Sequence, residues 1–160
     1  MKQTIRNKVI FKGTPGQLTS IVPALGTGEG EQCFLPERII PLDDNSEGAM
    51  KAAWGISSRP EEADYVLYRS QTILEYTFDT EDNAPMPLFH RLAERFPDVL
   101  LRIEYASHDY GEEVGLLEAP EGKHVLEMRE IDDPLVFACD LWGVDPEEEM
   151  AERMINQYEE

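Results

Sequence analysis

The sequence predicts an α+β fold in which a mostly antiparallel sheet carries helices packed on one face. Two observations support this prediction. Segments rich in β-branched and aromatic residues alternate with amphipathic segments of helical spacing along a chain of 160 residues. Apolar residues make up 41% of the composition, which is typical of a chain that packs a core. The length fits one domain over residues 1–160.

The N-terminal part begins with a predicted strand at residues 8–12, which a run of glycine, threonine and proline ends. Residues 17–25 place apolar side chains at helical spacing and predict a short helix that Pro23 limits. The glycine-rich stretch that follows lacks the residues of a phosphate-binding loop, so we interpret it as a linker. Residues 33–42 are apolar but contain two prolines, which favours an edge segment, and residues 49–54 predict a helical turn.

The middle of the chain has sharper patterns. Residues 65–68 and 72–78 are rich in β-branched and aromatic side chains and are predicted strands. A helix is predicted over residues 86–96, because proline is tolerated at its start and its apolar residues share one face. Residues 99–105 predict a further strand. The residues expected to pack this helix on the sheet are Leu88, Leu92 and Phe96.

The C-terminal part is predicted to contain a hairpin and a helix. Residues 114–118 and 124–129 flank a Pro-Glu-Gly turn, and residues 135–142 predict another strand or a buried apolar segment. A helix over residues 146–158 is marked by an aspartate cap, a first-position proline and a glutamate three residues after the cap. Its apolar stripe is expected to pack on the sheet, with docking on a partner as the alternative. The stripe consists of Met150, Ala151, Met154, Ile155 and Tyr158.

Several short motifs occur in an order that resembles a known family. They are Ile39-Ile40-Pro41, Trp54-Gly55, Phe78-Asp79-Thr80, Pro87-Leu88-Phe89, Leu92, Phe96-Pro97-Asp98 and Ile103-Glu104-Tyr105. Over roughly residues 30–117 the chain is similar to the YubB-type proteins of bacterial plasmids and phages. The resemblance implies a ferredoxin-like α+β fold and a mobile-element origin, and it transfers no catalytic residue. The family's opening Asn-Trp pair is absent, and Ile56-Ser57-Ser58-Arg59 replaces its tryptophan-rich segment.

The chain is strongly acidic, and its charge is unevenly distributed. The net charge is −19; residues 1–60 hold seven basic and six acidic groups, and residues 61–160 hold seven and twenty-seven. Direct binding of nucleic acid or of an acidic membrane surface is disfavoured, because both need clustered Lys and Arg. A basic protein surface is the expected partner, and the alternative is that the acidity only keeps the protein soluble.

Catalytic and metal-binding motifs are absent from the sequence. The three histidines lie in separate segments, and the two cysteines form no CxxC pair. Residues 105–111 contain a serine, a histidine and an aspartate, but adjacent residues rarely face one another productively, so a turn is favoured over a triad. We therefore expect no cofactor, no metal ion and no enzymatic activity. The few cysteines and the lack of a signal or spanning segment favour a cytoplasmic protein.

Two functional hypotheses from different classes follow. The first is an acidic interaction protein of a mobile genetic element, whose carboxylates mimic DNA phosphates and inhibit a host defence protein of a restriction or CRISPR system. The second is a small-molecule-binding domain or small enzyme that uses the loops at residues 78–84 and 105–113. The candidate partner-binding residues are Glu112, Glu113, Asp132, Asp133, Glu147, Glu148, Glu149 and Glu152.

Overall fold

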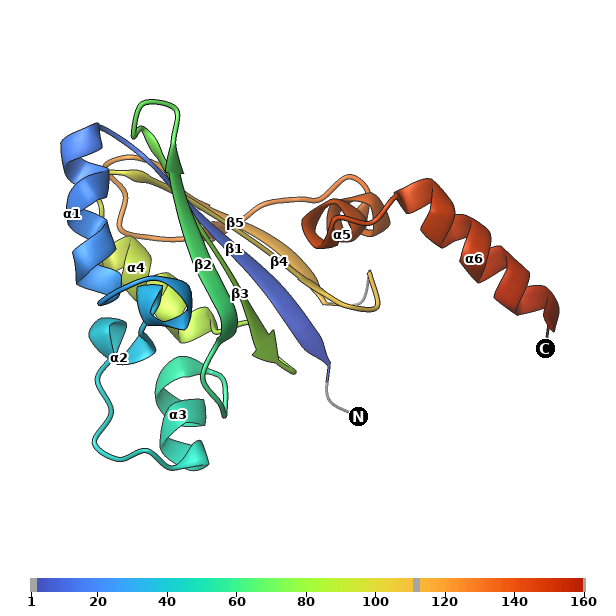
Figure 1. Cartoon of the computed structure of the whole chain (residues 1–160), viewed down its shortest axis with the longest axis horizontal. Coiled ribbons are helices and arrows are strands. Elements are labelled where there is room, and N and C mark those ends of the chain that lie inside the picture. Colours follow the sequence, from blue (N-terminus) through green and yellow to red (C-terminus); the bar gives the residue numbers. More distant parts are fainter. Residues whose placement is uncertain (1–2, 111–112, 160) are drawn as a thin grey trace.

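The computed structural model describes residues 3–110 and 113–159, and its described residues form one six-stranded sheet (Figure 1). Neighbouring strands in the order β2-β3-β1-β4-β5-β6 all pair antiparallel, which confirms the predicted antiparallel sheet. The strands are β1 (Thr4–Lys12), β2 (Glu61–Tyr68), β3 (Ile73–Glu81), β4 (Leu100–Ser107), β5 (Val114–Ala119) and β6 (Glu127–Met128).

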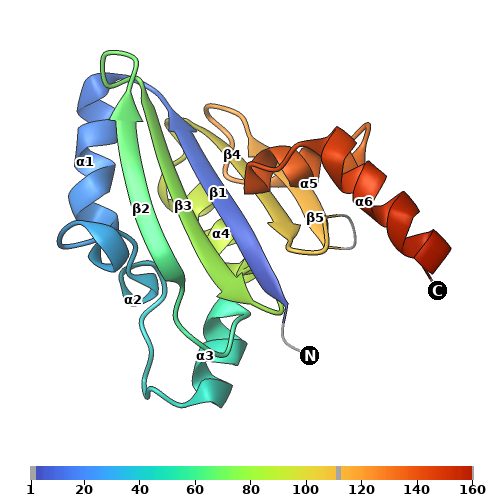
Figure 2. The same cartoon turned by 45° about the vertical axis from the view of Figure 1, so that its right-hand side comes forward.

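Helices α1 to α4 lie on one face of the sheet, α5 lies on the other face, and α6 leads away from the sheet (Figures 1 and 2). The helices are α1 (Pro15–Leu25), the 3₁₀ turn η1 (Gly30–Cys33), α2 (Pro36–Ile39), α3 (Glu47–Trp54), α4 (Met86–Arg95), α5 (Pro134–Trp142) and α6 (Pro146–Glu159). In the described part of the chain, none of these helices combines the length and the hydropathy that a membrane crossing needs.

The first four strands follow the ferredoxin-like arrangement. The units β1–α1–β2 and β3–α4–β4 interleave, so that β3 and β1 lie at the centre of the order β2-β3-β1-β4. Strands β5 and β6 extend the sheet beyond β4, and β6 pairs with β5 over two residue pairs. The predicted fold class is therefore confirmed, including the hairpin, although the prediction did not include a helix on the second face.

The core lies between the sheet and helices α1 to α4. Alternate residues of β1 point into it, and Val9 lies opposite Tyr76 while Phe11 lies opposite Leu74 on β3. The buried Asn7 on the same face donates its amide to the Phe78 carbonyl and the Thr80 hydroxyl. The alternation puts most of the apolar residues of β1 on the face that carries the helices and its charged residues on the other face, so a segment of mixed composition can form a central strand.

The predicted packing of α4 is confirmed. Leu88 and Leu92 are fully buried, and Phe96 packs edge-on against Phe11 at a ring-centroid distance of 5.9 Å. The helix ends at Arg95, whose guanidinium group donates to the backbone carbonyl of Arg38. Its apolar stripe therefore joins the sheet, while its polar face contacts the segment that contains α2.

Residues 33–42 are not an edge segment, so that prediction is wrong. They form the end of η1 and the short helix α2, in which Pro36 occupies the first turn. Phe34 stacks on Phe78 with ring centroids 4.4 Å apart, on the face of the sheet that carries the helices. Pro36 begins a helical turn that lies over the core, and Pro41 follows the end of α2.

Residues 135–142 are a helix and not a strand. Asp133 caps α5 by accepting from the backbone N–H of Val136, Pro134 stands in the first turn, and Gly143 ends the helix in the left-handed region. The burial of Ala138, Cys139 and Leu141 agrees with the predicted buried apolar segment. The Asp-Pro and Gly signals at the two ends were sufficient to predict this helix.

The described members of the apolar stripe of α6 do not pack on the sheet, which corrects the sequence prediction; the side chain of Tyr158 lies outside the described residues. The helix begins at Pro146 as predicted, but Met150, Met154 and Ile155 are 53%, 57% and 57% exposed. The reason is geometric: α5 ends over β4, so the chain enters α6 with its axis directed away from the sheet (Figure 2). Docking on a partner, the alternative for the stripe, stays a prediction.

Candidate partner-binding surface

The region that carries most of the candidate residues is the C-terminal arm, which we define as residues 131–160. It contains ten acidic groups and one basic group, whereas residues 61–130 contain seventeen and six. Helix α5 attaches the arm to the sheet: Ala138 and Leu141 are buried against Ala106 of β4. The arm is thus a separately attached element with about twice the negative charge density of the preceding part of the chain.

Trp142 is the main anchor of the arm. Its indole N–H donates to the backbone carbonyl of Ala106 at 3.0 Å, and the guanidinium carbon of Arg6 lies 4.1 Å from the centroid of its ring. Arg6 is itself held by two bonds to the carboxylate of Asp79, at 3.0 and 3.2 Å. His108 and Tyr110 pack against the same indole. Two segments distant in sequence, at Arg6 and at residues 106–110, therefore meet at Trp142.

The base of α6 is held by one cation. Arg153 pairs with Glu149 one turn earlier at 2.9 Å, and it also donates to the backbone carbonyl of Asp109 in the loop after β4. Burial first, and then the negative charge of Glu149, raise the pKa of the nearby Tyr110 hydroxyl. Arg153 therefore fixes the direction in which α6 leaves the sheet.

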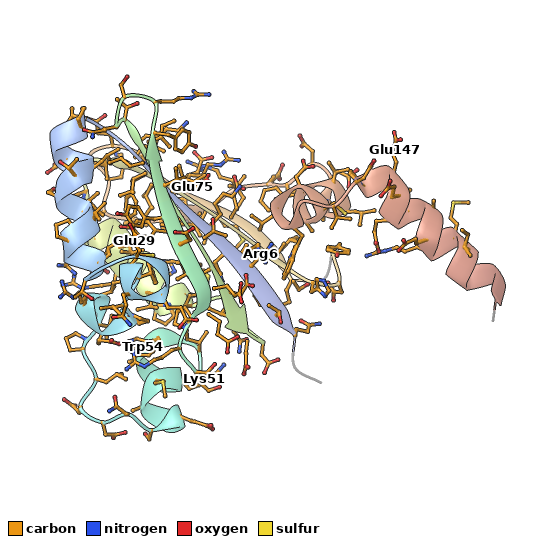
Figure 3. The ribbon with its side chains drawn as sticks, in the orientation of Figure 1. Arg6, Glu29, Lys51, Trp54, Glu75 and Glu147 are labelled. Carbon is orange, nitrogen blue, oxygen red and sulfur yellow. The ribbon has the colours of Figure 1, made fainter. Side chains whose placement is uncertain are left out.

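The structure brings some candidate residues together and separates others. Glu147, Glu148 and Glu152 are exposed on α6, and Glu147 lies at the start of the projecting helix (Figure 3). Glu149 is only 17% exposed and is paired with Arg153. Glu148 and Glu152, four residues apart, share one side of α6, and Glu147 lies on another side of its first turn.

The remaining candidates lie elsewhere. Glu113 is exposed next to the loop that contacts α6, and Glu112 lies outside the described residues. Asp132 is exposed before α5, and Asp133 caps that helix. Because α5 runs for nine residues between them and α6, these two aspartates stand at the far end of the arm's first helix.

Three cations on the second face of the sheet lie close to carboxylates. Arg6 pairs with Asp79 at 3.0 Å, and Lys8 lies 4.0 Å from Glu75. Arg102 pairs with Glu104 at 2.9 Å and with Glu118 at 3.4 Å. Arg6, Lys8 and Arg102 therefore each have a carboxylate neighbour.

The loops of the alternative hypothesis are occupied by structural contacts. Thr80 donates its hydroxyl to the carbonyl of Asn83 at 2.7 Å, and Asp82 accepts from the backbone N–H of Gln3 at 2.8 Å. Ser107 hydrogen-bonds directly to Asp109, while the ring of His108 packs on Trp142 with centroids 4.7 Å apart. The serine and the histidine are thus not arranged as a nucleophile and its base, which supports the predicted turn.

Neither cysteine is in a reactive setting. Burial, and then the charge of Asp64, raise the pKa of the Cys33 thiol to about 11. Burial followed by the charge of Glu149 raises the pKa of Cys139. Both thiols are therefore protonated near neutral pH and are poor nucleophiles.

We expect thermal unfolding to be the same with and without EDTA. Over residues 3–110 and 113–159, no three His, Cys, Asp or Glu side chains are grouped so that they could hold a metal ion. We therefore expect that a chelator removes no ion on which folding depends. Differential scanning calorimetry checks this, with added MgCl₂ as the control, and a midpoint lowered by several degrees in EDTA would contradict it.

Comparisons with known proteins identify no family for this chain. No family model matches it, and no curated protein matches it. It is similar to the crystal structure of the protein api92 from Yersinia pseudotuberculosis, described by the family model DUF1281, with a TM-score of 0.47 and 16% identity. The match covers 61% of this chain and 40% of that one, so the chain spans well under half the length of that protein. Similarity at this level carries no argument about function, and the resemblance to YubB-type proteins stays a prediction.

Proposed function

We propose that this protein is a non-enzymatic interaction protein whose C-terminal arm binds a basic surface of a partner protein. The observation that carries the proposal is the projecting helix α6, which exposes carboxylates and large apolar side chains together. In the described part of the chain, the apolar side chains of α6 belong to neither buried cluster. A helix with both properties is suited to a groove that is apolar inside and cationic at its rim.

The sequence of α6 arranges the two kinds of side chain as stripes. Met150 and Met154 are four residues apart and therefore lie above one another on one side of the helix. Glu148 and Glu152 have the same spacing on another side. Methionine adapts its shape to irregular apolar surfaces and is common at binding surfaces. The apolar stripe contributes affinity, and the acidic stripe contributes orientation and the rate of association.

A cationic partner accounts for the acids of α6 better than the helix dipole or self-association does. Glutamates in a first helical turn complement the dipole, which accounts for Glu147 to Glu149 but not for Glu152 in the next turn. Self-association through α6 would bring together two arms that each carry ten acidic groups and one basic group. Such like-charge contact is unfavourable, so a second copy of the chain fits the arm poorly.

The partner we propose is a nucleic-acid-binding groove of a host protein. Such grooves are lined by Lys and Arg that neutralise phosphates, and the carboxylates of the arm meet the same cations. The resemblance to YubB-type proteins of plasmids and phages supplies the biological context, in which a restriction or CRISPR protein is the target. The protein is then an acidic inhibitor that works in the cytoplasm of the host.

The proposal is tested first by capture from host lysate in 0.1 M and 1 M NaCl, with identification by mass spectrometry. The screening length falls to about 3 Å at 1 M salt, so a Coulombic contact should be lost there. The captured protein is then purified, and its association rate with the wild-type chain is measured at several salt concentrations. Nucleic acid is added as a competitor, because a shared groove predicts that one ligand excludes the other.

We expect the triple variant Glu147→Gln, Glu148→Gln, Glu149→Gln to associate at least about tenfold more slowly and with a weaker salt dependence. The matched control is Glu94→Gln, Asp98→Asn, Glu121→Gln, which removes three exposed charges at the opposite end of the sheet. The control should retain most of the wild-type rate. If the arm variant keeps both the wild-type rate and the wild-type salt slope, the three glutamates serve only as a helix cap.

The variant Met150→Ser, Met154→Ser tests the apolar stripe separately. Both side chains are more than half exposed, so the free protein should fold with little change in stability. The dissociation rate should rise about tenfold or more, because a groove that buries both side chains loses their apolar contact. An unchanged dissociation rate would limit the contact to the charged residues.

A further inference from the structure

Strand β2 forms one outer edge of the sheet, and an open groove of about 880 Å³ follows it. Glu29, Gly30 and Glu31, at the start of η1, form one side of this groove, and residues 62–67 of β2 form the other. We call this feature the β2-edge groove; Figure 3 marks Glu29 next to the strand. It is far from the C-terminal arm, which attaches over β4 at the other side of the sheet (Figure 1).

The backbone of β2 has hydrogen-bonding groups that face this groove. The N–H of Tyr65 donates to the side chain of Asp64 at 2.8 Å, so it is directed away from the partner strand β3. Because backbone direction alternates along a strand, the N–H and C=O of Leu67 share this outward direction. The structure places no further strand beside β2 within its described residues. The groups of Leu67 are therefore positioned to pair with an additional strand, and the N–H of Tyr65 can do so by exchanging its bond to Asp64.

The groove selects for positive charge. Four exposed carboxylates line it, and neither Lys nor Arg does. They belong to Glu29, Glu31, Glu62 and Asp64, and in the described part of the chain none of the four forms an ion pair within 4.0 Å. A second copy of this chain, with its net charge of −19, is repelled from such an edge. Val66, 46% exposed, adds an apolar contact on the strand itself.

We propose that the β2-edge groove binds an extended, lysine- or arginine-rich segment of a protein by β-strand addition. Backbone pairing with the outward groups of Tyr65 and Leu67 supplies the affinity. The four carboxylates favour binding of a segment whose basic residues alternate with apolar ones. This site is independent of the arm and goes beyond the function proposed above.

The probe is the peptide acetyl-Lys-Val-Lys-Val-Lys-Val-Lys-amide, titrated into the full chain at 50 mM NaCl and followed by amide NMR shifts. We expect shifts centred on residues 63–68, with slowed hydrogen exchange at Tyr65 and Leu67. The same peptide with N-methylated valines keeps its charge but loses alternate N–H donors, so it should bind at least about tenfold more weakly. A Glu-Val peptide of equal length should not bind.

Two sets of charge variants locate the site. The variant Glu29→Gln, Glu31→Gln, Glu62→Gln, Asp64→Asn should weaken binding about tenfold, and the Gln variant of Glu147 to Glu149 should leave it unchanged. The arm variant tests the function proposed for the C-terminal arm, and the groove variant tests peptide binding at β2. Each proposal can therefore be contradicted without affecting the other. The proposal is overturned if the Lys-Val peptide does not bind, or if the N-methylated peptide binds as tightly as the unmodified one. It is also overturned if both charge variants lose the same binding affinity, or if the hydrogen-exchange protection of β2 depends only on protein concentration.

Discussion

Trp54→Ala is expected to lower the free energy of unfolding by about 3–5 kcal/mol. The indole is fully buried between α3 and the core, and its N–H donates to the backbone carbonyl of Ile40 at 2.8 Å. Removing it leaves a cavity of aromatic size and a carbonyl without its donor, and both effects destabilise. Equilibrium unfolding in urea, followed by circular dichroism, measures the change.

Trp54→Phe separates the two contributions. Phenylalanine keeps most of the buried area but cannot donate to Ile40, so we expect a smaller loss of about 1–3 kcal/mol. The position of Trp54 in Figure 3, at the end of α3 that faces the sheet, explains why its removal should also loosen that helix. A loss below about 1 kcal/mol for Trp54→Ala would mean that α3 does not pack as the structure shows.

Leu92→Ala is expected to lower the free energy of unfolding by about 2–5 kcal/mol. Leu92 is fully buried on the face of α4 that contacts the sheet, between Leu88 and Phe96 along the same stripe. The matched control is Glu94→Ala two residues later, which is exposed and should change stability by less than about 0.5 kcal/mol. The same urea titrations measure both variants, and similar values for the two would place α4 on the surface.

The candidate surface was partly predictable. The uneven charge and the acids of α6 are properties of the sequence, and they indicated the arm before its position was known. The anchoring of the arm was not predictable, because Arg6, Trp142 and His108 come from separate parts of the chain and no local pattern joins them. The β2-edge groove was missed for the same reason: Glu29 and Asp64 approach each other only because η1 lies along an edge strand.

The sequence by itself determined most of the elements and the fold class. The strands and the helix between residues 61 and 107 follow from alternation, helical periodicity and proline position, which are local properties of a few successive residues. The Asp-Pro-Glu start of α6 determined where that helix begins. The prediction of an edge segment at residues 33–42 is wrong because Pro36 begins a helical turn there. The prediction of a strand at residues 135–142 is wrong because Asp133 and Gly143 cap a helix, although the segment is buried and apolar as the alternative stated.

Only the tertiary structure decided which apolar stripes are covered. The stripes of α4 and α6 are both amphipathic, yet Leu92 is fully buried and Met154 is 57% exposed. Periodicity shows which face of a helix is apolar, but what covers that face depends on where the preceding segment places the helix. Here α5 occupies the second face of the sheet through Trp142, and α6 begins beyond it. Helix α6 leads away from the sheet, so Met150, Met154 and Ile155 stay exposed.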